Sequence, residues 1–371
     1  MQEEEKLYTI ALSRVDGIGG IMFRQLINMF GTAEEVFNAS SQKLLKIPNF
    51  GKATYDRLKQ NTQAFAEAKV ILEKSEKENI RTITFKDDDY PKRLKQIYEA
   101  PPILYTKGNG KLEYEKTLAI VGTREASDYG KKVTEEIIEG LAGLNIQVIS
   151  GLAYGIDIAA HKAALKHKVS TVAVLANSLD SVYPAMHKKY AQEILEDGLL
   201  MSENPYGSKL APAYFISRNR IIAGLSDVVL VVESAKKGGS MVTAEFANNY
   251  NRDVFAIPGS VYQKFSEGPN YLVQTNKAQI FSNTEDLAAW MQWGLNDEGK
   301  KAPKLEREID LASFTLDESK VLSVLMQKGE VMIDELSWQS QVPLNKLASI
   351  LLNLEFQDLV VQSPGKKFKL K

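Results

Sequence analysis

The sequence of 371 residues contains no cysteine, which excludes disulfide bonds, zinc sites with thiolate ligands and catalysis by a cysteine nucleophile. It also lacks any apolar run approaching the roughly 20 residues that a membrane-spanning helix requires. The acidic N-terminal segment, residues 1–6, has no apolar stretch of the kind found in secretory signals. We therefore expect a globular cytoplasmic protein without a membrane span.

Histidine is scarce as well, and the three histidines are isolated from one another. The sequence has no Walker loop, no nucleophile elbow in a Ser-His-Asp order and no G-x-G-x-x-G dinucleotide fingerprint. Each histidine is better explained as a hydrogen-bonded or solvent-facing side chain than as a metal ligand. These absences favour a binding protein over an enzyme, with no catalytic residue, no metal and no cofactor.

A strong excess of basic residues, common in nucleic-acid binders, is also missing. The 46 lysines and arginines are offset by 47 aspartates and glutamates, for a net charge of −1. A binding site for nucleic acid would therefore depend on a local cluster of positive charge offset by acidic residues elsewhere.

Residues 1–75 have apolar positions at helical spacing and predict an N-terminal helical domain. Two segments in it are alike, Val15–Gly19 and Ile47–Gly51, each with a Gly or Asn suited to positive φ. Such turns join the helices of helix-hairpin-helix domains, where exposed amides can hold a DNA phosphate. The sequence leaves open the simpler alternative of ordinary helix–helix turns.

Residues 80–293 predict an extended, Rossmann-like, doubly wound α/β domain. Two short apolar segments separated by prolines, 82–85 and 103–105, suggest edge strands. Near-continuous Val, Ile and Leu runs then alternate with segments of helical period, which is typical of parallel strands buried on both faces. The runs begin at Leu118, Val148, Thr171, Leu199, Val228 and Val254.

Residues 294–312 are polar, charged and without periodicity, and predict a linker. Residues 313–371 show three short helical patterns and then a hairpin with a Pro-Gly turn, which together predict a winged-helix-like domain. The lysines of the C-terminal tail are better explained as a solvated surface than as a DNA contact.

In an open parallel sheet, ligands bind beyond the carboxyl ends of the strands. After the first run come Gly122, Thr123 and Arg124, then Ser127 before a helix. Backbone amides, hydroxyls and a fixed positive charge in this order indicate an anion-binding loop.

The second run ends at Ser150 and Gly151, where glycine lets the backbone approach a ligand closely. Both residues are candidate ligand contacts. Asp157, a few residues later, is better explained as a helix cap.

A third segment holds Phe215, Arg218, Asn219 and Arg220. Arginine suits phosphate oxygens because its guanidinium donates paired hydrogen bonds. Phe215 could stack on an unpaired base or lie in the core, and the sequence does not decide between the two.

A fourth segment, with Lys237, Gly239 and Ser240, opens a helix after an apolar strand and predicts a second phosphate-binding turn. With Arg124, Arg218 and Arg220, Lys237 would form a positive patch on a nearly neutral chain. Such a patch suits a flexible polyanion, and we expect single-stranded DNA.

These motifs resemble the DNA-processing protein A (DprA/Smf) family in order and spacing. The resemblance rests mainly on Ile120–Arg124, Ser150–Ala153, Gly155–Asp157, Tyr183–Pro184, Arg218–Ser226, Gly239–Ser240 and Pro258–Gly259. It implies a homodimeric mediator of recombination that binds single-stranded DNA and displaces single-strand-binding protein. It also implies loading of the RecA recombinase onto strands entering by natural transformation.

The resemblance also implies an N-terminal domain of helix-hairpin-helix or SAM-like type and a DNA pocket formed by the four segments above. Tyr154 departs from the family, which usually has arginine at this position. The change removes one positive charge, and the aromatic ring could stack or pack instead.

Two other functions remain as alternatives. Residues 238–245 resemble the glycine-rich loop of phosphoribohydrolases, in which Arg124 would hold the phosphate of a nucleoside monophosphate and Glu245 would assist ribose cleavage. The winged-helix-like domain could instead read duplex DNA, although Leu344, Asn345 and Lys346 would make a poor base-reading surface.

Overall fold

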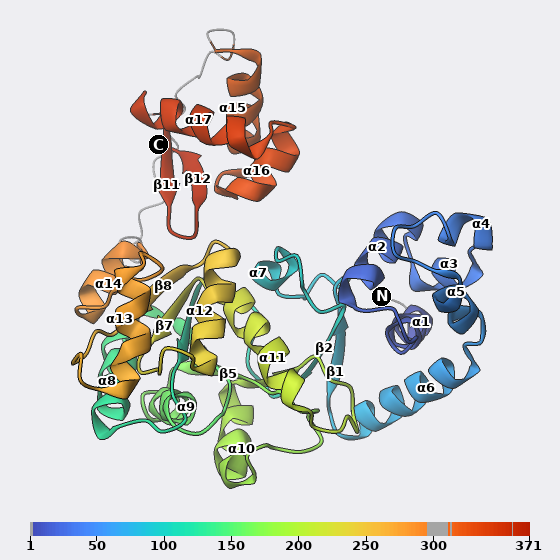
Figure 1. Cartoon of the computed structure of the whole chain (residues 1–371), viewed down its shortest axis with the longest axis horizontal. Coiled ribbons are helices and arrows are strands. Elements are labelled where there is room, and N and C mark those ends of the chain that lie inside the picture. The colour runs from blue at the N-terminus through green and yellow to red at the C-terminus, as the bar shows by residue number, and fades with distance from the viewer. Residues whose placement is uncertain (1–2, 295–310, 312–313, 358) are drawn as a thin grey trace.

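The structure is a computed structural model and describes residues 3–294, 311, 314–357 and 359–371. Three parts follow one another along the chain: a group of helices, a large α/β part and a small C-terminal part (Figure 1). The linker predicted over residues 294–312 falls mainly outside the described residues. In the part of the chain that is described, no helix is long and apolar enough to cross a membrane.

The N-terminal part is helical, and its apolar side chains meet in a shared core. The Tyr8 ring packs against Phe37 and Phe65, with centroids 5.9 and 5.1 Å away. The elements are α1 (Glu3–Ser13), α2 (Gly20–Phe30), α3 (Ala33–Asn38), α4 (Ser41–Leu44), α5 (Lys52–Lys59) and α6 (Thr62–Lys77).

The two similar turns of the sequence also have similar backbone conformations. Gly17 and Asn49 hold corresponding positions, with φ of 92° and 64°. Glycine adopts positive φ freely and asparagine tolerates it. Because α2 follows Gly19 and α5 follows Gly51, each turn leads directly into a helix.

A nine-stranded sheet in the order β1-β2-β6-β5-β4-β3-β7-β8-β9 forms the central part. From β6 to β9 all neighbours pair in parallel, while β1 and β2 form an antiparallel edge. The predicted Rossmann-like sheet is therefore confirmed. Its strands are β1 (Arg81–Thr84), β2 (Ile103–Lys107), β3 (Lys116–Val121), β4 (Ile146–Ser150), β5 (Ser170–Val174), β6 (Leu199–Ser202), β7 (Val228–Val231), β8 (Asp253–Ala256) and β9 (Gln279–Ile280).

Helices cover both faces of the sheet, and the side chains of β3 alternate between two cores. Leu118 and Ile120 pack with residues of α8 and α9, whereas Ala119 and Val121 belong to the core that includes α11 and α12. The helices are α7 (Lys92–Lys95), α8 (Asp128–Leu141), α9 (Ile156–Lys166), α10 (Lys188–Asp197), α11 (Pro212–Leu225), α12 (Gly239–Asn249), α13 (Glu267–Gln274) and α14 (Thr284–Trp290), with short 3-10 turns η1 (Ala142–Leu144), η2 (Ala185–His187) and η3 (Lys264–Ser266).

The strand order reverses at β3. From β3 the chain winds through β4, β5 and β6 on one side, and then returns to place β7, β8 and β9 on the other. In doubly wound sheets a crevice opens beyond the carboxyl ends of the strands at such a reversal. The loops after β3 and β7 therefore border the expected ligand crevice.

The C-terminal part has three helices and a small sheet in the order β10-β12-β11, which confirms the predicted winged helix. β11 and β12 form the hairpin, and Gly365 in its turn has a φ of 77°. The elements are α15 (Leu316–Lys328), β10 (Val331–Met332), α16 (Ile333–Ser340), α17 (Leu344–Phe356), β11 (Val360–Ser363) and β12 (Lys367–Leu370).

The winged helix contacts the turn that precedes β8. Asn251 donates to Asp334 at 3.1 Å and accepts from the Lys366 ammonium at 2.7 Å. The backbone amide of Gly365 donates to the Asp253 carboxylate at 2.7 Å. The tip of the β11–β12 hairpin is therefore held against the α/β part.

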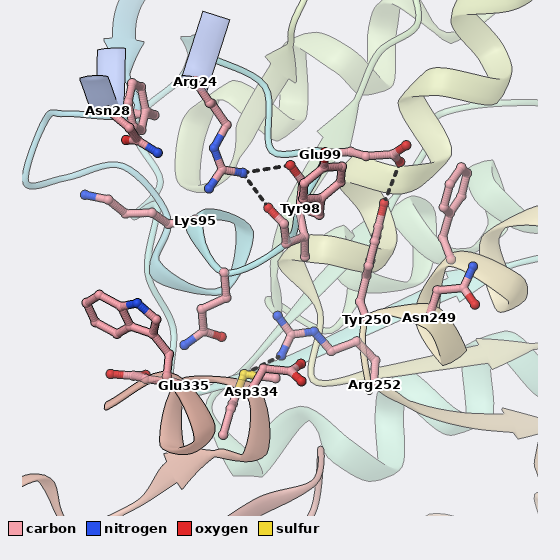
Figure 2. A pocket seen from close by; sticks show the side chains of 16 residues that line it. Arg24, Asn28, Lys95, Tyr98, Glu99, Asn249, Tyr250, Arg252, Asp334 and Glu335 are labelled. Carbon is pink, nitrogen blue, oxygen red and sulfur yellow. Dashed lines mark hydrogen bonds between the residues drawn. The ribbon is translucent and has the colours of Figure 1, made fainter. Parts of the chain in front are cut away.

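A cavity of about 1080 Å³ lies where the three parts meet, at the C-terminal end of α12 (Figure 2). Arg24 of α2 donates to the carbonyl oxygens of Ile97 and Tyr98 on its wall. Arg252 is buried and contacts Met332 of the winged helix. Burial lowers the pKa of Arg252 to about 10, so this guanidinium stays charged at neutral pH.

Candidate nucleic-acid interface

A second cavity, of about 370 Å³, lies beyond the ends of β3 and β7, between α11 and the N-terminus of α12; we call it the strand-end pocket. Most of the predicted site residues line it. They are Gly122, Thr123, Arg124, Phe215, Arg218, Asn219, Gly239 and Ser240. The pocket thus joins three of the four predicted segments at the point where the strand order reverses.

The loop after β3 depends on Gly122. A Cβ atom there would lie 2.4 Å from Ile156 Cγ1 and 2.9 Å from the Glu233 carbonyl oxygen. The amide of Thr123 donates to that same carbonyl at 2.6 Å. Because glycine leaves this space free, the loop packs closely against α9 and the segment after β7 and presents Arg124 at the rim.

Arg124 is exposed, and the carbon of its guanidinium lies 5.3 Å from the centre of the Phe215 ring. A guanidinium over an aromatic face is held by cation–π attraction and keeps its N–H groups available. Among the described residues, no carboxylate forms an ion pair with Arg124. It is therefore the cation of the pocket best suited to an incoming phosphate.

The N-terminus of α12 forms another wall. Gly238 precedes the helix, and a Cβ atom on it would lie 2.3 Å from Ser234 Oγ. The Ser240 hydroxyl donates to Ser234 Oγ at 2.8 Å, and Asn219 donates to the Gly239 carbonyl at 3.2 Å. These bonds fix the first turn of α12, whose free amides and dipole favour an anion.

Lys237 precedes this turn and is exposed, but it is not one of the residues that line the strand-end pocket. Its neighbour Lys236 lies 4.7 Å from the centre of the Tyr271 ring. Lys237 can therefore add positive charge near the entrance without forming a wall.

Arg218 lines the pocket but is largely buried, with 6% of the residue exposed. Its guanidinium donates to the carbonyl oxygens of Gly151 at 2.5 Å and Val174 at 2.6 Å. Burial lowers the pKa of Arg218, and the negative charge of nearby Asp157 opposes that shift. Arg218 therefore ties the ends of β4 and β5 to α11. The donors used in these two hydrogen bonds are not available to a ligand.

Asp157 is the buried counterpart of Arg218. Burial raises the pKa of its carboxyl, while the charge of Arg218 and hydrogen bonds from the backbone of Ala153 and Gly151 oppose the rise. It lies in the first turn of α9, but Gly155 is the N-cap of this helix and no side chain caps it, so the interpretation of Asp157 as a helix cap is wrong. Its electrostatic interaction with Arg218 is a role that the sequence did not indicate.

Arg220 does not reach the strand-end pocket. The sequence placed both Arg218 and Arg220 in the predicted positive patch, but residues 212–225 form helix α11, on which residues two apart point in different directions. Arg220 instead pairs with Glu203 at 2.6 Å. The structure therefore does not bring Arg220 into the pocket with Arg218.

Ser127, Ser150 and Gly151 also lie outside the lining of the pocket. Ser127 caps α8 by accepting from the Gly130 amide at 3.0 Å, and its hydroxyl donates to Glu233. Ser150 is fully buried and donates to the Ile120 carbonyl at 2.6 Å. Gly151 makes room for Arg218, because a Cβ atom would lie 2.1 Å from its Nη1. All three residues therefore stabilise the structure around the pocket and do not form its lining.

Sequence reasoning missed several residues of the lining. Phe265 comes from the loop after β8, and its carbonyl accepts from the Ser234 amide at 2.7 Å. No predicted motif includes Phe265, which reaches the pocket only through the fold. The other lining residues outside the predicted set are Val121, Ala153, Asp157, Ile216, Ile222, Ser234, Ala235, Gly238, Val242 and Thr243.

Comparison with known families identifies the chain. Residues 81–292 match the family described as DNA recombination-mediator protein A, and residues 307–366 match the DprA winged helix domain. The chain belongs to the DprA family. The chain is 31% identical to Protein Smf of Synechocystis sp. over 402 aligned residues that cover 100% of both chains. It is 42% identical to the DNA processing protein DprA of Streptococcus pneumoniae, over 54% of this chain and 71% of that protein.

Solved DprA structures have the same fold. The X-ray structure of DprA from Streptococcus pneumoniae matches with a TM-score of 0.62 and 32% identity, over 78% of this chain and 98% of that one. DprA from Helicobacter pylori, described for its single-stranded DNA binding mode, matches with a TM-score of 0.52 and 31% identity, over 57% and 94%. Membership of this family makes the chain a DNA-processing protein that mediates recombination.

Proposed function

We propose that the chain binds single-stranded DNA and that the strand-end pocket receives its phosphates. The observation that carries this proposal is the meeting of exposed Arg124, packed on Phe215, with the fixed first turn of α12. A guanidinium and free helix amides both favour phosphate oxygens, and the ring of Phe215 offers a face for an unpaired base. The Helicobacter pylori relative, which binds single-stranded DNA, supports the same ligand.

The test is a fluorescence anisotropy titration with a labelled single-stranded oligonucleotide and with its duplex. The intact chain should prefer the single strand, and Arg124→Ala should weaken binding about 10- to 150-fold, the loss expected for a charge-assisted phosphate contact. Arg81→Ala, which removes an exposed arginine on the edge strand β1, is the matched control and should bind normally. Equal affinity for duplex, or an unaffected Arg124→Ala protein, would contradict the proposal.

We also propose that the chain acts as a homodimer that loads RecA onto single strands and displaces single-strand-binding protein, including during natural transformation. Family membership supports these partners. RecA filament formation on a strand coated with single-strand-binding protein should accelerate when the chain is added. Arg124→Ala should lose this effect along with DNA binding.

The enzymatic alternative fits the geometry less well. Glu245, which that mechanism requires beside the ribose, is exposed on α12 and does not line the strand-end pocket. We therefore propose a binding protein without catalytic residues. Incubation with AMP or CMP should release no free base, and release would revive the alternative.

A further inference from the structure

A row of exposed aromatic and apolar side chains runs beside the strand-end pocket. Tyr183 is 47% exposed, Tyr154 40% and Met186 78%, and Phe215 is half-buried at the pocket end of the row. Large side chains of this kind usually gather in cores or at binding surfaces. We call these four residues the aromatic ledge.

Two contacts and one short segment of chain link the four residues. The Tyr183 ring meets Phe215 at 5.7 Å between centroids, and the Tyr154 hydroxyl lies 3.8 Å from the Met186 sulfur. Tyr183 and Met186 belong to one short segment, which therefore joins Phe215 at one end to Tyr154 at the other. Since Phe215 also lies under Arg124, the ledge begins where the proposed phosphate site ends.

The ledge rests on a fixed support. His187 is buried, and its Nδ1 lies 2.7 Å from the Leu152 carbonyl oxygen. The Tyr154 ring meets the His187 ring edge-on, with centroids 5.1 Å apart. A stacking surface held in place loses little entropy when a ligand covers it.

We propose that the aromatic ledge binds unpaired bases by stacking. One phosphate of the strand occupies the strand-end pocket, and these bases belong to the nucleotides that follow it. The inference rests on the proposed function and specifies which part of the DNA this surface recognises. Bases have apolar faces that stack on aromatic rings, whatever their sequence. Positive charge lies at Arg124, at one end of the ledge, and at exposed Lys188, two residues after Met186, which favours a polyanion over an apolar protein surface.

The experiment compares two ligands of equal charge, a 20-nucleotide oligothymidylate and an abasic strand of the same length, with the full-length chain. Tyr183→Ala and Tyr154→Ala should each weaken binding of oligothymidylate roughly 5- to 150-fold. Both should bind the abasic strand as the unchanged chain does, because the phosphate contacts remain. Tyr183→Phe and Tyr154→Phe should bind normally, since the ring is kept. Tyr98→Ala, at an exposed tyrosine on the wall of the other cavity, is the matched control.

The outcomes separate this inference from the proposed function. If the unchanged chain fails to bind single strands, the proposed function is wrong. If it binds but the alanine variants match it on oligothymidylate, or lose equal affinity for both ligands, the ledge does not hold bases. If a variant misfolds, a measurement on the unchanged chain still tests the inference. The fluorescence of 2-aminopurine placed in the bound strand should fall when the base stacks on the ledge. Unchanged fluorescence at every position in the strand would overturn the inference.

Discussion

Substitution of Arg218 by methionine separates a structural role for this residue from a direct role in DNA binding. The change keeps a long side chain but removes the donors that serve the Gly151 and Val174 carbonyl oxygens. It also leaves the buried Asp157 carboxyl without its cation. Each buried carbonyl left without its donor costs about 1–3 kcal/mol, so the loss of two such bonds should cost about 2–6 kcal/mol, and the buried Asp157 charge also loses the nearby positive charge.

The pH dependence of that loss follows from Asp157. Burial already raises the pKa of its carboxyl, and loss of Arg218 removes the charge that opposes this rise. A buried acid with a raised pKa binds a proton more readily in the folded chain than in the unfolded chain, so the variant gains stability as pH falls. The deficit of Arg218→Met should therefore be smaller near pH 5 than near pH 8.

Urea denaturation followed by far-UV circular dichroism measures this deficit. Arg81→Met, at an exposed ion pair, should change stability by less than about 1 kcal/mol and serves as the control. The reasoning would be refuted if Arg218→Met were as stable as the unchanged chain. If such a stable variant had also lost DNA binding, Arg218 would instead be a direct contact.

Three further outcomes are expected. Gly122→Ala should lower the free energy of unfolding by about 1–3 kcal/mol, and with it the melting temperature, because the new Cβ would overlap Ile156; an unchanged melting temperature would argue against the close packing of this loop. Burial lowers the pKa of His161 to about 3 from 6.5, so between these values the unfolded chain binds a proton that the folded chain does not. Stability should therefore fall by about 1.4 kcal/mol per pH unit through this group as pH drops, and a urea series on the unchanged chain and His161→Gln should show their difference varying with pH. Asn251→Gly keeps the φ of 56° but removes the amide that contacts Asp334 and Lys366, so hydrogen exchange in the β11–β12 hairpin should accelerate; equal exchange would mean that these contacts do not hold the hairpin.

The sequence was most informative where burial imposes a pattern. Apolar runs such as the one from Leu118 to Val121 predicted parallel strands, because a strand covered on both faces needs apolar residues at every position. Gly122 and Arg124 could be placed at a strand end for the same reason, since the end of the run marks the end of the strand.

Helix direction was the point at which sequence reasoning failed. Arg218 and Arg220 are close in sequence, but α11 turns one toward the strand ends and the other toward Glu203. Ser127 precedes a helix and Ser150 ends a strand, both in segments predicted to bind the ligand, yet their hydroxyl groups donate to Glu233 and to the Ile120 carbonyl. Whether a polar group binds a ligand or stabilises the fold depends on hydrogen-bond partners that are far away in the sequence. No local motif reveals those partners.

The salt dependence of single-stranded DNA binding tests the central claim most directly. A plot of the logarithm of the association constant against the logarithm of the salt concentration should slope downward for the unchanged chain. The reason is that cationic side chains that bind phosphates release the counterions condensed on the DNA. For Arg124→Ala the slope should become shallower by about 0.7, the value for one lost phosphate contact on a single strand. Identical slopes would mean that Arg124 holds no phosphate, and the strand-end pocket would not be the DNA site.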